Sequence, residues 1–182
     1  MKTDKPGFMD SFSKNFERYI REYSIENVLY EEGYKFLQRG WLERDEFLKI
    51  CLWKSRRSKV LLRKNKEERV RSITRKAFAE PDEAMKIKTL QKLSGVGLPM
   101  ASAILSVTDP QKYPVIDIRT MQALKKMSLI EYKTITINSW LKYLDVIEEL
   151  KKKFKKSARE IDKALFAYHR LQLDKDFKNL YS

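Results

Sequence analysis

Two glycines one residue apart, in the stretch 93–99 (Leu-Ser-Gly-Val-Gly-Leu-Pro), are the feature of this chain best suited to bind an anion. Apolar helical patterns precede and follow them, which predicts a tight turn between two helices. Gly95 and Gly97 can adopt a positive φ and carry no side chain, so backbone N–H groups at the start of the second helix would face outward. A helix N-terminus carries partial positive charge, which favours a phosphate as the ligand. Alternatively, Gly95 only ends the first helix and Gly97 only permits close packing.

Asp117, in the stretch 113–120 (Tyr-Pro-Val-Ile-Asp-Ile-Arg-Thr), is a candidate catalytic residue. The pattern puts its carboxylate at the end of a short extended apolar segment and at the start of a helix. A carboxylate in such a place can stabilise a developing positive charge or orient a water molecule. Aspartate is also favoured as a helix N-cap, so capping is the alternative role.

The elements that must position these residues are helices. Apolar residues recur with helical spacing from residue 10 onward, and no alternating strand pattern of useful length appears. We predict an all-α fold, with a flexible arm over 1–9 and a single compact multi-helix domain over 10–182. Within it we expect a central helix-hairpin-helix over about 82–107, with a buried second helix, and the aspartate step over 113–127. Asn65 and Glu68 are spaced as a capping box.

Composition favours a polyanionic partner. Lys and Arg outnumber Asp and Glu by 39 to 25, which gives a formal net charge of +14. The single cysteine, Cys51, excludes an internal disulfide or a cysteine-rich metal site within the chain and is expected in the core. We find no transmembrane span or signal-peptide pattern, and expect a cytoplasmic monomer with no membrane partner.

A basic segment over 53–59 (Trp-Lys-Ser-Arg-Arg-Ser-Lys) ends the predicted helix that contains Cys51. Lys54 and Arg56 are candidate phosphate contacts at the rim of a site. The equally weighted alternative is a basic last turn that complements the helix dipole.

The hairpin and Asp117 together resemble the helix-hairpin-helix DNA glycosylase superfamily. Its signature is Leu-x-Gly-hydrophobic-Gly, then an alanine-rich helix, then an apolar-Asp-x-Arg/His step, which correspond here to residues 93–97, 101–105 and 115–119. Asp117 lies eighteen positions after Pro99, as in the family's spacing. The resemblance covers about residues 90–124.

The resemblance implies a glycosylase that hydrolyses the N-glycosidic bond of a damaged or modified base flipped out of double-stranded DNA, with Asp117 as the catalytic carboxylate. It also implies a sodium or potassium ion on the backbone carbonyls of Leu93 and Val96, and no other cofactor. The expected DNA contacts are Ser94, Gly95, Val96, Gly97, Leu98, Pro99, Lys54, Arg56 and Arg119. Trp41, Trp53 and Tyr168 are candidates to stack on the base, although aromatic residues at helical spacing more often belong to a core.

Two departures from the family narrow this expectation. Bifunctional members carry a Schiff-base lysine where Pro99 stands, so the resemblance implies a monofunctional enzyme. The four-cysteine cluster of some members is missing from this chain. Two other classes remain open: a non-enzymatic helix-hairpin-helix module that docks on DNA, and a helical domain that binds RNA or a protein partner.

Overall fold

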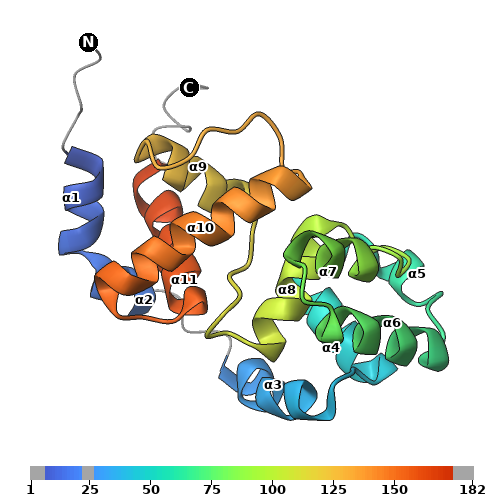
Figure 1. Ribbon diagram of the computed structural model, residues 1–182. Helices are drawn as coiled ribbons and strands as arrows, with labels where there is room; N and C mark the ends of the chain where they lie inside the picture. The colour runs from blue at the N-terminus through green and yellow to red at the C-terminus, as the bar shows by residue number, and fades with distance from the viewer. Residues whose placement is uncertain (1–6, 22–26, 174–182) are drawn as a thin grey trace.

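The computed structural model describes residues 7–21 and 27–173, and within these ranges every regular element is a helix (Figure 1). The all-α prediction is therefore confirmed. The helices, in chain order, are α1 (Gly7–Lys14), α2 (Phe16–Arg21), α3 (Asn27–Arg39), α4 (Arg44–Lys54), α5 (Lys59–Leu62), α6 (Glu67–Ala79), α7 (Glu83–Leu90), α8 (Leu98–Thr108), α9 (Ile118–Lys126), α10 (Ile137–Phe154), α11 (Ala158–Tyr168) and the short π-helix η1 (His169–Leu173).

The helices form two groups that do not follow chain order (Figure 1). One group holds α3 to α8, in which α8 packs on α3, α4 and α7. The other joins both ends of the described chain, because α11 packs on α2 as well as on α9 and α10. Helices α7 and α10 pack together across the boundary, and the segment 109–117 connects the two groups.

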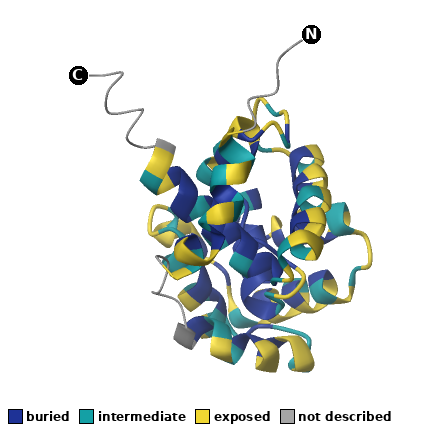
Figure 2. Ribbon diagram, turned by 90° about the vertical axis from the view of Figure 1, so that its left-hand side faces the viewer, coloured by how far each residue is buried: buried dark blue, intermediate teal, exposed yellow. Residues whose placement is uncertain are grey.

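Helix α8 lies at the centre of its group and confirms the predicted buried element. Every residue of α8 except Pro99 is buried, and Figure 2 shows buried segments gathered in the middle of the molecule with exposed ones around them. Its last turn allows a very close approach by α3: a Cβ added to Gly33 would lie 1.7 Å from the carbonyl oxygen of Val107. Glycine is the residue that permits this helix contact, since any side chain would overlap the backbone of α8.

Asp82 is the N-cap of α7 and accepts the Met85 amide at 2.7 Å. The core position predicted for Cys51 is confirmed, because the residue is buried in α4, where burial raises the pKa of its thiol. Two other local predictions do not hold. The flexible arm predicted over 1–9 is wrong for residues 7–9, which belong to α1, whereas residues 1–6 lie outside the described ranges. The capping box predicted at Asn65 is also wrong, because Lys66 is the N-cap of α6.

No helix in the described ranges combines the length and the apolar character needed to cross a lipid bilayer.

Candidate functional site

The glycine turn joins α7 to α8, with Gly95 in the left-handed region at φ +80° and Gly97 as the N-cap of α8. The buried side chain of Asn65 holds the turn in place. Its amide oxygen accepts the Ser94 N–H at 2.8 Å, and its amide nitrogen donates to the Ser94 and Leu62 carbonyls at 2.9 Å. These bonds commit the Asn65 amide to the glycine turn and to Leu62, and Lys66 rather than Asn65 is the N-cap of α6.

Gly95 also allows α5 to pack against the turn. A Cβ added to Gly95 would lie 3.0 Å from the Leu61 Cβ and 3.2 Å from the Leu62 nitrogen. The close packing that sequence offered as the alternative role of Gly97 is found at Gly95 instead, since a Cβ added to Gly97 would meet only the Pro99 Cδ, at 3.9 Å. This packing is compatible with an anion site, because the two roles use different atoms of the turn.

Three backbone N–H groups of the turn are left for a ligand. Among the described residues, the amides of Gly95, Gly97 and Leu98 have no hydrogen-bond acceptor, and Gly97 is exposed. The other predicted contacts of the turn offer no free amide: the Ser94 N–H is bonded to Asn65, the Val96 N–H to the Leu93 carbonyl at 3.2 Å, and Pro99 has none. The anion site that the geometry allows is therefore smaller than the predicted stretch 94–99.

The predicted cation ligands are the carbonyls of Leu93 and Val96. The Leu93 oxygen already accepts the Val96 N–H, so only one of its lone pairs is left for an ion. The described residues contain no group of three or more His, Cys, Asp or Glu side chains that could hold a metal ion. A monovalent cation at the turn stays a prediction.

The segment before Asp117 is fixed by side chains from four helices. The backbone N–H groups of residues 115–117 donate in turn to Asp162 of α11, to Ser102 of α8 at 3.1 Å and to Thr120 of α9 at 3.1 Å. Tyr143 of α10 donates to the Val115 carbonyl at 3.3 Å, and burial raises the pKa of this phenol well above its usual value, which keeps the donor proton in place. Four helices therefore set the position of the aspartate.

The two oxygens of Asp117 have different partners. Oδ1 accepts the N–H groups of Arg119 at 3.0 Å and Thr120 at 3.1 Å, which makes Asp117 the N-cap of α9. Oδ2 forms an ion pair with Lys54 Nζ at 3.1 Å, and the two side chains are only 18% and 21% exposed. Capping, which sequence offered as the alternative role, occupies one oxygen and leaves the other turned toward Lys54.

Asp117 lies in the wall of a cavity of about 650 Å³ at the junction of the two helix groups. Residues 53–57 at the end of α4 form one side, and Val115, residues 117–120, Arg159, Asp162 and Phe166 form the rest. Lys54, Arg56 and Arg119, predicted to contact DNA, all line it. Its size falls within the range of about 300–1,000 Å³ that is usual for ligand pockets.

Of the three aromatic residues predicted to stack on a base, only Trp53 lines this cavity. Trp41 lies against the Arg75 guanidinium, 4.4 Å from its ring centroid, and donates from Nε1 to Glu43 at 3.2 Å. Tyr168 is buried in an aromatic cluster with Phe12 and Tyr19. Tyr168 therefore serves packing, whereas Trp41 is half-buried in the bend before α4 and pairs with Arg75 and Glu43.

The glycine turn and the cavity are structurally connected. The Ser102 hydroxyl that accepts the Ile116 amide also donates to the Pro99 carbonyl at 2.9 Å, so Ser102 links the first turn of α8 to the segment before Asp117. A second hollow, of about 540 Å³, shares Trp53 and Arg56 with the cavity and continues along Lys59 of α5. Basic side chains thus run from the helix that packs on Gly95 to the cavity of Asp117.

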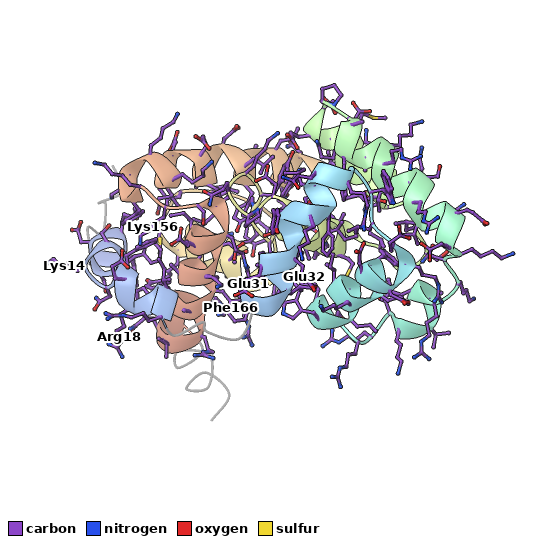
Figure 3. All side chains as sticks on the ribbon, turned by 90° about the horizontal axis from the view of Figure 1, so that it is seen from below. Lys14, Arg18, Glu31, Glu32, Lys156 and Phe166 are labelled. Atoms are coloured by element: carbon purple, nitrogen blue, oxygen red, sulfur yellow. The ribbon has the colours of Figure 1, made fainter. Side chains whose placement is uncertain are left out.

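Sequence reasoning missed three parts of the cavity. The pairing of Lys54 with Asp117 joins residues 63 positions apart, which no local pattern reports. Arg159 and Asp162 form a buried ion pair, and Phe166 lies on α11 (Figure 3); the spacing of all three on one helix was the available signal. No family model, curated protein or solved structure matches the chain.

Proposed function

We propose that this protein is a monofunctional DNA N-glycosylase, which binds double-stranded DNA and hydrolyses the N-glycosidic bond of a base flipped out of the helix. The single observation that supports this most is Asp117: it lines a cavity of about 650 Å³, and Ser102 links the segment before it to the first turn of α8.

Each part has a physical task in this reaction. As the bond between the base and C1′ breaks, positive charge builds on the sugar, and a carboxylate beside that carbon stabilises it and orients the attacking water. The amides of Gly95, Gly97 and Leu98 would bind a phosphate of the strand whose base is extruded. This contact helps to offset the few kcal/mol that unstacking costs.

The chemistry is proposed to stop at hydrolysis. Pro99 has no amine to attack the sugar. Lys54 is held in an ion pair with Asp117, and an ammonium group has no free electron pair for attack. Base release should therefore leave an intact abasic strand, without a covalent protein adduct.

The test uses duplexes that each carry one damaged base, incubated with wild-type protein, Asp117→Asn and the matched control Asp145→Asn. Asp145 is an exposed aspartate on α10, outside the cavity lining. We expect base release with the wild type and the control, and a loss of at least about 100-fold with Asp117→Asn. Equal release by the wild type and Asp117→Asn would contradict the catalytic role of Asp117.

A non-enzymatic DNA-docking module is the second candidate, and one observation favours it. Both oxygens of Asp117 already have partners within the protein, as they would if the residue served only structure. This candidate predicts duplex binding that weakens with salt, persists in Asp117→Asn and is accompanied by no base release.

Competition between duplex DNA and RNA at one fixed salt concentration tests the RNA-binding alternative.

A further inference from the structure

The cavity beside Asp117 carries an excess of positive charge. Among the residues that the structure describes, five cationic side chains and two carboxylates line it, so this described lining has a formal net charge of three positive. The two carboxylates are also paired: Asp117 with Lys54, and Asp162 with Arg159. A cationic ligand would therefore enter a site whose negative groups are already neutralised, at a cost in free energy.

Two of these cations also lie beside the aromatic walls of the cavity, which further disfavours a cationic ligand. The Arg159 guanidinium, whose side chain is 8% exposed, lies 5.6 Å from the ring centroid of Trp53. The Arg119 guanidinium lies 5.1 Å from the centroid of Phe166. Each ring thus has a cation close to it, and the stacking of a second cation on either ring would be opposed by the first.

The charge that a base carries in DNA determines the charge that it carries as it leaves. A base that is neutral in DNA leaves with the electron pair of the broken bond, and so carries negative charge in the transition state. A base alkylated on a ring nitrogen, such as N7-methylguanine, is cationic in DNA and leaves neutral. Fixed positive charge around the leaving base lowers the barrier in the first case and raises it in the second.

We infer that the cavity selects bases that are neutral in DNA and leave as anions, with Arg119 stabilising the charge on the departing base. This inference rests on the proposed glycosylase function. In the step, the bond from C1′ to the base nitrogen breaks and its electrons go to the base. A water oxygen bonds to C1′ and gives up a proton, which ends on the released base or in solvent.

The experiment measures base release from duplexes of one sequence that carry uracil, hypoxanthine, 8-oxoguanine, N7-methylguanine or N3-methyladenine. Each rate is divided by the spontaneous rate for the same duplex, because cationic bases leave faster without any enzyme. We expect the enhancement for at least one neutral base to exceed that for either cationic base by about 100-fold or more.

Arg119→Gln, with Lys152→Gln on the exposed side of α10 as the matched control, tests the role of the guanidinium. We expect it to slow release of neutral bases by about 100-fold and to leave release of cationic bases unchanged. Across uracils with different 5-substituents, the plot of log rate against the acidity of the free base should also become steeper. A variant that is merely less stable would shift all these rates together and keep the slope.

Each outcome decides a separate point. The largest enhancement for a cationic base would overturn the inference and leave the glycosylase proposal standing. No release from any duplex would refute both. Release of neutral bases with an equal loss for both classes in Arg119→Gln would overturn the role given to Arg119.

Discussion

The side chain of Asp117 has two roles, one as a helix cap and one as a carboxylate in the cavity. Its Oδ1 caps α9, and its Oδ2 meets Lys54 at the cavity wall. The cap fixes the rotamer of the carboxylate, because two backbone N–H groups hold one oxygen. The second oxygen is thereby set in place without a separate support.

Because one oxygen of Asp117 caps α9, we expect Asp117→Ala and Asp117→Asn to destabilise the protein by different amounts. Asp117→Ala removes the cap and should lower the free energy of unfolding by about 1–2 kcal/mol, whereas Asp117→Asn keeps a capping oxygen and should cost about half as much or less. Urea unfolding measures both values.

Asp82 provides the matched control, because it caps α7 through the Met85 amide and does not line the cavity. Asp82→Ala should cost a similar amount of stability and leave base release unaffected. Equal losses for Asp117→Asn and Asp117→Ala would show that the cap contributes nothing at this position.

The close packing of α3 on α8 requires a glycine at position 33. A side chain at position 33 would overlap the Val107 carbonyl, so we expect Gly33→Ala to lower the free energy of unfolding by about 1–3 kcal/mol, although alanine favours helices. Thermal unfolding of Gly33→Ala and of Gly7→Ala tests this, since a Cβ at Gly7 meets nothing within 4 Å. Similar midpoints for the two variants would contradict the close approach.

Helices, caps and turns could be predicted from the sequence where a pattern of a few neighbouring residues indicates them. The N-cap at Asp117, the buried α8 and the turn between α7 and α8 all follow from patterns within a few residues. Asn65 shows the limit: its capping spacing is real, but the side chain bonds to Ser94, 29 residues later, because a buried amide must satisfy all its polar atoms. The cavity could not be foreseen, since its walls come from distant helices that only tertiary packing brings together.

For the molecule as a whole, the net charge of +14 predicts duplex binding that falls steeply with salt. If DNA lies along the glycine turn and the cavity, Arg56→Gln should reduce the slope of log affinity against log salt by about 1. Lys153→Gln is the control, because Lys153 is exposed near the end of α10, on the side of the molecule away from α5 (Figure 1). Equal changes in slope would point to binding without a preferred face.

The pairing of α2 with α11 has a consequence for how the protein forms during synthesis. Helices α3 to α8 are contiguous and can assemble as soon as they leave the ribosome, whereas the other group must wait for α11. Arg159, Asp162 and Phe166 all lie on α11, so the cavity closes only in the last stage of folding. A nascent chain would thus carry the glycine turn before it carries a completed cavity.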